Sequence, residues 1–177
     1  MTLLTGHYRR SLDDKSRLAI PKPLRAQLAD SPLFASPGLD ACLALYPEDE
    51  FARVADRLAA NSPVARATRD YSRLFFSQAE RLTFDGQGRI RLPATLAERA
   101  RLGSEIVLVG VRDHLEVWNS ESWDAFVSQR DVCYDELAER AFEGPSAGES
   151  QAQSIPTAED LQPLHGGQDD RSPARPR

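Results

Sequence analysis

The stretch DDKSRLAIP, residues 13–21, returns in modified form as DGQGRIRLP, residues 85–93. Both copies begin with aspartate, carry an arginine four positions later and end on proline. The residues after the aspartate favour a turn, and the apolar residues that follow alternate with period two, as in a strand with one buried face. The closing proline suits the start of a short helix. The sequence therefore predicts the same turn, strand and helix twice.

The two copies lie within longer repeats. When the sequence is shifted by 72 positions, the two halves align without a gap, and a duplication explains this agreement. One unit of about 45 residues is too small for a good core, so we expect the two units to pack strand against strand as a pseudo-dimer. Identical residues occur at Arg9/Arg81, Asp13/Asp85, Arg17/Arg89, Pro21/Pro93, Leu24/Leu96, Gly38/Gly110 and Leu43/Leu115.

Each unit is expected to contain four short strands and to be followed by a helix. In both copies the first strand ends just before the turn and the second follows it, with Leu18 and Ile20, or Ile90 and Leu92, facing inward. We expect helices after Pro47 and from residue 122, and a further helix joining the halves. The remaining predicted elements are strands at 34–37, 42–46, 105–111 and 114–118, and the joining helix at 63–76.

The C-terminal part differs in composition from the rest. The last 34 residues contain five Pro, four Gly and four Ser, and they contain no aromatic residue. Such a segment buries too little apolar surface to offset the entropy of ordering, so we expect disorder there. The predicted organisation is a first unit at 7–50, a helical linker at 51–78, a second unit at 79–122, a helix at 123–142 and a disordered tail at 143–177.

Charge and composition limit the functional classes. The formal net charge is −5, but residues 1–29 carry six cations and two acids, whereas residues 131–177 carry ten acids and four arginines. A polyanion responds to the local patch, so the basic N-terminal region is compatible with DNA or RNA. No apolar run is long enough to span a membrane, and the N-terminus does not resemble a secretory signal. The isolated Cys42 and Cys133 fit a reducing cytosol better than a disulfide, and their spacing does not predict a zinc site.

Three segments together resemble the MraZ family of bacterial regulators, built from two SpoVT-AbrB-like units. They are TGHYRRSLDDKSRLAIPKPLR at 5–25, RLFFSQAERLTFDGQGRIRLP at 73–93 and LVGVRDHLEVWNSESWDAF at 108–126. The resemblance covers roughly residues 4–127. It implies an α+β fold with a swapped-hairpin β-barrel in each half, ring-like homo-oligomers and binding of double-stranded DNA. It also implies transcriptional control of the division and cell-wall gene cluster, in the cytoplasm at the nucleoid.

The resemblance places the DNA-contacting residues around the first turn, at Asp14, Lys15, Ser16 and Arg17. Members of the family usually have glycine where this chain has Ser16. A non-glycine residue at positive φ costs about 1–2 kcal/mol. Either this turn has a different geometry or Ser16 tolerates the strain, in which case its hydroxyl can bond a phosphate.

Arg17 has two interpretations. It can pair with Asp13 and stabilise the turn, or it can contact a base or a phosphate with its fork of donors. Arg89 invites mainly the first interpretation, with Asp85. What favours DNA contact at Arg17 is that the first copy alone surrounds its arginine with cations. Arg10, Lys15, Lys22 and Arg25 stand where the second copy has Leu82, Gln87, Ala94 and Ala97.

The other cations rank below Arg17. Lys15 at the tip of the turn is the next candidate, although an exposed lysine is often merely solvated. Arg9 and Arg10 are adjacent on a strand, so they point to opposite faces and cannot both enter one groove. Lys22 and Arg25 can contact backbone phosphates or simply form a solvated face.

The sequence contains no arrangement that predicts an enzyme. Asp13 and Asp14 are explained better by turn formation than by acid–base chemistry. We therefore expect no enzymatic activity, cofactor, metal or small-molecule substrate. The aromatic pairs Tyr46/Trp118 and Phe51/Trp123, at the repeat offset, are interpreted as core residues. A protein-interaction module, such as an antitoxin or a scaffold, and an RNA-binding protein remain the alternatives to a sequence-specific DNA-binding regulator.

Overall fold

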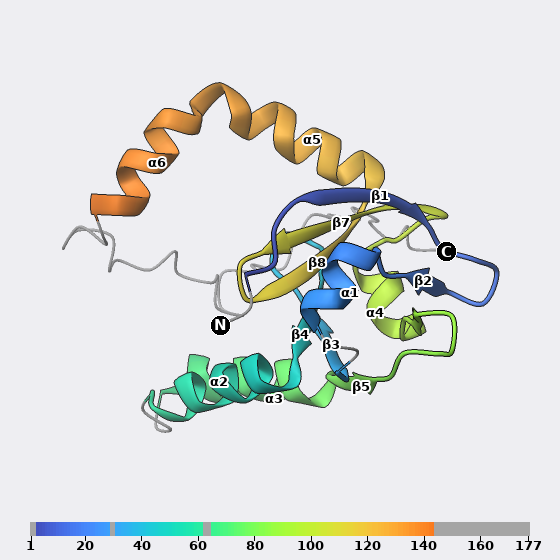
Figure 1. Cartoon of the computed structure of the whole chain (residues 1–177). Helices are drawn as coiled ribbons and strands as arrows, with labels where there is room; N and C mark the ends of the chain where they lie inside the picture. Colours follow the sequence, from blue (N-terminus) through green and yellow to red (C-terminus); the bar gives the residue numbers. More distant parts are fainter. Residues whose placement is uncertain (1–2, 29–30, 62–64, 144–177) are drawn as a thin grey trace, which may run out of the picture. The chain divides into compact units, whose positions relative to one another are not determined.

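The computed structural model describes residues 3–28, 31–61 and 65–143 (Figure 1). The chain divides into two compact units, Met1–Cys133 and Tyr134–Arg177. The first unit combines strands with helices, so the prediction of a mixed α+β protein is confirmed. The predicted disordered tail lies outside the described residues, apart from Glu143, the last residue of a helix.

Strands from both repeats form one six-stranded antiparallel sheet. Its order is β1-β7-β8-β4-β3-β5. The strands that make up the sheet are β1 (His7–Ser11), β3 (Leu33–Pro37), β4 (Leu43–Pro47), β5 (Glu80–Leu82), β7 (Glu105–Val111) and β8 (His114–Asn119). The strands predicted at 34–37, 42–46, 105–111 and 114–118 correspond closely to β3, β4, β7 and β8.

The two repeats exchange their first strands. β1 of the first repeat pairs with β7 of the second, and β5 of the second repeat pairs with β3 of the first. The pairing of β4 with β8 joins the two hairpins in the middle. A swapped-hairpin β-barrel in each half was expected, but the barrel is not closed: the sheet is open, and its outer strands β1 and β5 do not pair in the described part of the chain. Since one repeat has few apolar residues, sharing a sheet gives both repeats a single core.

A separate two-stranded ribbon is formed by the predicted inner strands of the two turns. β2 (Arg17–Ala19) runs antiparallel to β6 (Arg89–Arg91), and Leu18 lies opposite Ile90. Both of these side chains are buried, with 0% and 1% of their surface exposed. The pairing continues beyond the ribbon, because Leu92 N donates to Ser16 O over 2.9 Å.

The helices follow the strands as predicted, with one difference. A single C-terminal helix at 123–142 was expected, whereas the structure has two helices separated by a 3₁₀ turn at Asp131–Cys133. Asp, Val and Cys all have low helix propensity, which explains a break at this point. The helices are α1 (Lys22–Leu28), α2 (Glu48–Ala59), α3 (Arg66–Ser77), α4 (Ala94–Arg99), α5 (Ser120–Arg130) and α6 (Tyr134–Glu143).

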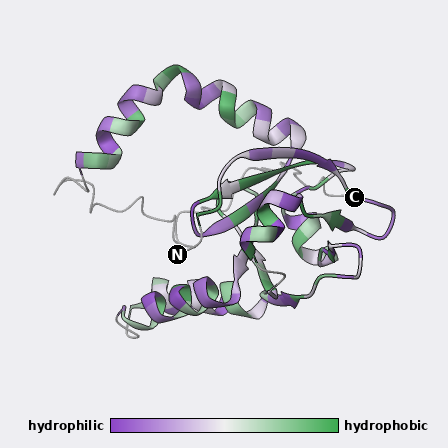
Figure 2. Cartoon of the chain, in the orientation of Figure 1, coloured by the Kyte–Doolittle hydropathy of each residue, from purple (hydrophilic) through white to green (hydrophobic). Residues whose placement is uncertain are grey.

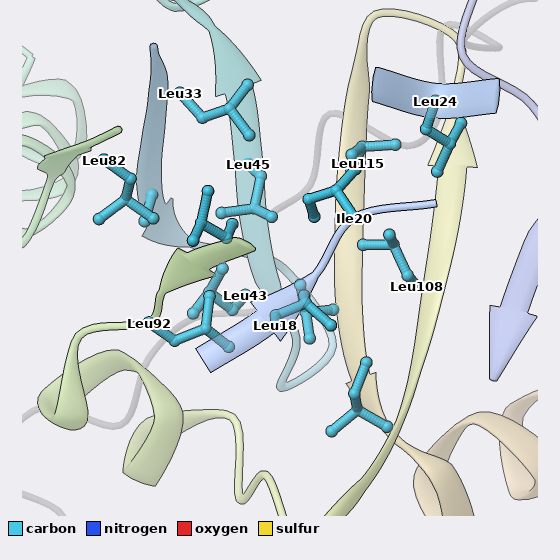
Figure 3. Packing of buried hydrophobic residues seen from close by; sticks show 14 of the residues in the cluster. Leu18, Ile20, Leu24, Leu33, Leu43, Leu45, Leu82, Leu92, Leu108 and Leu115 are labelled. Carbon is cyan, nitrogen blue, oxygen red and sulfur yellow. The ribbon is translucent and has the colours of Figure 1, made fainter. Parts of the chain in front are cut away.

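The core joins leucines from both repeats. In the close view, Ile20 of the first repeat lies among Leu108 and Leu115 of the second (Figure 3). Leu18 and Leu92, from the residues that surround the two turns, belong to the same cluster. Burying each of these side chains contributes about 1.5–3 kcal/mol, and the two repeats therefore stabilise each other.

The aromatic residues pack between a strand and the helix that follows it. Phe51 of α2 stacks on Phe34 of β3, with ring centroids 4.5 Å apart, and also contacts Tyr46. In the second repeat, Trp118 of β8 packs edge-on against Trp123 of α5. These rings are part of the packing, as the sequence predicts.

The cysteines, the helix lengths and the polarity of the turns complete the description. Cys42 is buried and Cys133 partly buried, and both are free thiols. Among the described helices, none is long and apolar enough to cross a lipid bilayer. The segments that lead into β2 and β6 are hydrophilic (Figure 2).

Candidate nucleic-acid interface

The turn before β2 is organised by Asp13. Its Oδ1 accepts hydrogen bonds from the backbone N–H groups of Lys15 and Arg17, each over 2.9 Å. Its Oδ2 accepts from Nε of Arg17 over 2.6 Å. The N–H of Ser16 closes the turn onto the carbonyl of Asp13. The short aspartate side chain thus fixes both the turn and the arginine that follows it.

The turn before β6 has the same hydrogen bonds. Oδ1 of Asp85 accepts from the N–H groups of Gln87 and Arg89 over 2.9 and 3.0 Å. Oδ2 of Asp85 lies 2.8 Å from Nε and from Nη2 of Arg89. The N–H of Gly88 closes this turn onto Asp85. The repeated aspartate and arginine therefore have a structural role in both copies.

These contacts lower the pKa values of both carboxylates. The backbone hydrogen bond from Arg89 and the ion pair with its side chain lower the pKa of Asp85 to about 2. The backbone hydrogen bond from Arg17 is the main cause of a lowered pKa at Asp13, where the Arg17 side chain and the N–H of Lys15 also contribute. Both carboxylates are therefore charged at neutral pH, and each offsets the charge of its own arginine.

Arg17 nevertheless keeps donors for another partner. Its ion pair with Asp13 uses Nε, and within the described residues its Nη nitrogens make no hydrogen bond. The side chain is 31% exposed. An aspartate that holds the Nε edge fixes the direction in which the Nη edge points, so that the two interpretations of Arg17 are compatible.

Ser16 resolves the open question about the first turn. Its φ is 55°, close to the φ of 72° at the equivalent Gly88. The turn therefore keeps the geometry of a glycine turn, and the serine adopts the left-handed conformation. Position 88 has less room, because a Cβ there would overlap the guanidinium of Arg25 from α1. Glycine in the second turn therefore adopts positive φ without strain and leaves room for the guanidinium of Arg25, which would have to move if position 88 carried a side chain.

The other predicted residues lie in different surroundings. Asp14 and Lys15 are exposed at the tip of the first turn. Arg9 on β1 donates to Ser120 and Asp124 of α5, each over 2.6 Å, and so connects this helix to the sheet. Arg10 is exposed and lies over the ring of Tyr8, with 5.9 Å between its guanidinium carbon and the ring centroid. Neither arginine belongs to the turn.

The ribbon adds one arginine, Arg91, that sequence reasoning did not consider. Arg91 lies directly opposite Arg17, and Arg89 opposite Ala19. Since opposite residues in an antiparallel pair share a face, all of these side chains are on the outer face of the ribbon. The alignment of the repeats cannot reveal this, because it equates residues 72 positions apart and carries no information about which strands pair.

Each turn borders a shallow cleft. A cleft of about 360 Å³ beside the first turn is lined by Ser16, Arg91, Thr95 and Glu80, among others. A cleft of about 420 Å³ beside the second turn is lined by Arg25, Asp85 and both glycines of that turn. Because the ribbon strands are antiparallel, the helix after one turn lies beside the other turn. Arg25 of α1 therefore lies at the second turn, and not beside Arg17 as expected from the alignment of the repeats.

A second group of titratable residues lies at the hairpin between β7 and β8. Nδ1 of His114 is 2.7 Å from Oδ1 of Asp113, and Nε2 is 3.7 Å from Oε1 of Glu116. Burial alone would lower the pKa of His114, but hydrogen bonds to Glu116 and Asp113 raise it overall. The ring also stacks on Tyr46, with centroids 4.7 Å apart. No cluster of three metal-ligating side chains occurs here or elsewhere among the described residues.

The fold and the site define a class: a duplicated α+β protein in which both repeats contribute one turn to a shared, arginine-bearing ribbon. The family model described as "MraZ protein, putative antitoxin-like" matches residues 3–74 and again 75–144. The chain belongs to the MraZ family.

Several bacterial relatives agree with this assignment. The chain is 37% identical over 137 residues to a protein of Lactobacillus johnsonii, covering 77% of this chain and 95% of the relative. It is 39% identical over 138 residues to a protein of Desulforamulus reducens, covering 77% and 96%. A protein of Bifidobacterium longum is 36% identical over 137 residues, covering 77% and 91%. Each of these relatives is named "Transcriptional regulator MraZ".

Proposed function

We propose that this protein is a transcription regulator that binds double-stranded DNA sequence-specifically through the turn before β2. The observation that carries the proposal is the first turn itself: Lys15 is exposed at its tip, and Arg17 is held by Asp13 through Nε alone. Donors that are fixed in direction before binding lose less entropy on contact with a ligand. The names of the relatives support a role in transcription.

The residues of the turn have different roles in this proposal. Arg17, with Lys15, reads base edges in the major groove, since a guanidinium fork matches the acceptors of guanine. Ser16 offers its hydroxyl to a phosphate, and Asp14 lies at the edge of the contact. Arg10 approaches the backbone, where contacts set the register of the protein on the duplex. Arg9 lies at the periphery, because α5 already binds it.

Assembly is the second part of the proposal. The exchange of strands between units 7–50 and 79–122 is consistent with an AbrB-like pseudo-dimer, and we propose that these pseudo-dimers associate into a ring. One subunit binds DNA weakly, whereas several subunits on short repeated promoter sites gain avidity. We place the protein in the cytoplasm at the nucleoid and its sites in the division and cell-wall gene cluster.

The test begins with selection of binding sites from random duplexes by the purified full-length protein. The affinity for the selected duplex is then measured from about 50 to 200 mM salt, a range in which phosphate contacts weaken steeply. We expect Arg17→Ala to abolish the preference for the selected duplex, with the oligomer unchanged by size-exclusion chromatography. Arg89→Ala is the matched control, because it breaks the same ion pair in the other turn.

Three outcomes would contradict the proposal. Equal losses in Arg17→Ala and Arg89→Ala would mean that only turn stability matters. A loss confined to Arg89→Ala would assign the contact to the other turn. Finally, if single-stranded or duplex RNA of the same sequence competes better than the DNA duplex, the protein binds RNA.

One observation favours a second candidate function, protein binding. An apolar cleft of about 440 Å³ between α2 and α3 is lined by Ala55, Leu58 and Phe76, and Phe76 is itself exposed. An antitoxin or a scaffold can offer such a cleft to a partner. The variant Phe76→Asp distinguishes the two functions: DNA affinity stays unchanged if the cleft serves a protein partner only.

A further inference from the structure

An arginine at position 91 does not help to stabilise the ribbon. It lies on β6, in register with Arg17 on β2, and both side chains are on the outer face. Directly opposite residues have their Cβ atoms about 5 Å apart, and like charges in this position destabilise a sheet. The first repeat avoids such a pair at the other end of the ribbon, where Ala19 lies opposite Arg89.

Arg91 also differs from the two arginines of the turns in its partners. Arg17 and Arg89 each contact their own aspartate at 2.6–2.8 Å. Within the described residues no carboxylate lies within ion-pair distance of Arg91, and its side chain is exposed. The charge of Arg91 is therefore the uncompensated charge on this face of the ribbon.

The surroundings of Arg91 suit an anion that approaches the first turn. It lines the cleft of about 360 Å³ together with Ser16 of the first turn and Thr95 of α4. Two hydroxyl groups and a guanidinium are donors for phosphate oxygens. Glu80 lines the same cleft and limits the number of phosphates there, because its carboxylate repels them.

We propose that Arg91 of the second repeat contacts a DNA phosphate beside the base contact of Arg17, so that the DNA-binding surface is built from both repeats. This inference rests on the proposed function. It differs from the expectation that the first repeat alone makes the contacts. In this proposal the second repeat takes part in DNA binding, because its Arg91 lies next to Arg17, whose charge is offset by Asp13.

The experiment compares charge-matched variants of the full-length protein on two duplexes, one selected and one unrelated. Arg91→Ala removes the cation. Ala19→Arg/Arg91→Ala moves it to the other end of the ribbon, opposite Arg89, at constant net charge. Arg57→Ala removes one exposed arginine from α2, outside the ribbon. Arg91→Lys keeps the charge and loses the fork.

We expect Arg91→Ala to bind both duplexes roughly tenfold more weakly, since a hydrogen bond to a charged group is lost. The preference for the selected duplex is kept, and the slope of log affinity against log salt falls by about 0.9, which corresponds to one phosphate. The double variant shows the same loss, Arg91→Lys keeps the slope, and Arg57→Ala binds like the parent protein. Arg91→Ala is expected to melt slightly above the parent temperature, because it removes the like-charge pair with Arg17. The other variants are expected to melt close to the parent temperature, since the double variant exchanges one like-charge pair for another.

Four results would overturn the inference. The first is an unchanged affinity and slope in Arg91→Ala while Arg17→Ala fails to bind, which leaves the proposed function intact. The second is full binding by Ala19→Arg/Arg91→Ala, which means that the position is irrelevant. The third is a lost sequence preference in Arg91→Ala, which makes Arg91 a base contact. The fourth is that the parent protein shows no salt-dependent DNA binding, in which case the proposed function fails as well.

Discussion

The turns before β2 and β6 share their internal hydrogen bonds, but they differ in the residues around them. Inside, an aspartate accepts two backbone N–H groups and the Nε of an arginine in both copies. Outside, the first turn has a lysine at its tip and an arginine across the ribbon, while the second has glutamine and alanine at these positions. The shared hydrogen bonds explain why both copies fold alike. The charged residues that differ between the copies are the candidates for a specific function.

The difference extends to a pair of compensating residues. The first turn has Ser16, and the position equivalent to Arg25 in the second repeat is Ala97. The second turn has Gly88, and Arg25 covers it. The turn with glycine, at Gly88, thus has a bulky helix residue, Arg25, beside it. The turn with serine, at Ser16, occurs together with the small residue Ala97 at the equivalent helix position. In the second turn, the helix residue beside the glycine comes from the other repeat, because Arg25 belongs to α1.

The largest expected effect tests whether the repeats share one core. Leu18→Ala and Ile90→Ala each remove a buried side chain from the pair that joins β2 to β6. Each is expected to lower the free energy of unfolding by about 2–5 kcal/mol, measured by chemical denaturation. Either substitution should lower the midpoint of a single transition seen by the fluorescence of Trp118 and Trp123 and by far-UV circular dichroism.

Two separate transitions in either variant would contradict this expectation. In that case one repeat would remain folded when the other unfolds, and the exchange of β1 and β5 would not couple them. Phe142→Ala serves as the control, because its side chain is 92% exposed. It should leave the midpoint unchanged.

The next effect sharpens the difference between the turns. Gly88→Ser is expected to destabilise the protein by about 1–2 kcal/mol, because it places a side chain at positive φ, and it also displaces the guanidinium of Arg25. The double variant Arg25→Ala/Gly88→Ser recreates the combination of the first turn and should recover part of this loss. Conversely, Ser16→Gly should add up to about 1 kcal/mol, since it relieves the left-handed serine. If the double variant is no more stable than Gly88→Ser, steric conflict with Arg25 is not the cause.

Much of the fold could be predicted from the internal repeat. The alternation at Leu18 and Ile20, and the prolines that begin short helices, are local signals, and the elements lie close to where they were expected. The offset of 72 residues, however, fits two closed barrels as well as one sheet with exchanged strands. Which strand pairs with which depends on contacts between distant segments, so the shared open sheet could not be predicted.

The candidate site was predictable only in part, for the same reason. Asp13, Lys15 and Arg17 are close in sequence, and their turn could be inferred from residue types. Arg91 is 74 positions from Arg17, and only the register of the ribbon brings them together. The contact of Arg9 with α5 depends on tertiary packing in the same way.

A smaller effect tests whether the aspartates are equivalent. The pKa of Asp85 is lowered from 3.8 to about 2, chiefly by the N–H of Arg89, and that of Asp13 is lowered by the N–H of Arg17. A group whose pKa is lower in the folded state stabilises the protein above its unfolded pKa. This stability is lost as the pH falls from about 4 towards 2. Asp85→Asn should therefore flatten the decline of stability with acid over this window, measured by urea unfolding at each pH.

The matched variant Asp13→Asn extends this test to the other copy. If the two turns are equivalent, it flattens the same acid limb by a similar amount. A steep acid limb retained in both variants would show that other carboxylates, such as Glu116, control acid unfolding.

The smallest effect concerns the β3–β4 hairpin of the first repeat and the β7–β8 hairpin of the second. Cys42 in the first hairpin corresponds to His114 in the second. Burial raises the pKa of Cys42 to about 12, so this thiol stays protonated. The pKa of His114 is raised despite burial by Glu116 and Asp113. A raised pKa contributes stability that is complete below about pH 6.5 and is lost as the pH rises through the folded-state value.

We therefore expect the stability of the parent protein to decline as the pH rises above about 6.5 and through the raised pKa of His114 in the folded state. His114→Gln should remove this decline. Tyr46, which stacks on the ring, does not titrate in this range because burial raises its pKa to about 12. Arg112 pairs with Asp113 at 3.0 Å. A decline of the same size in His114→Gln would mean that the alkaline limb arises outside this hairpin, and the second repeat would then have no pH response that the first lacks.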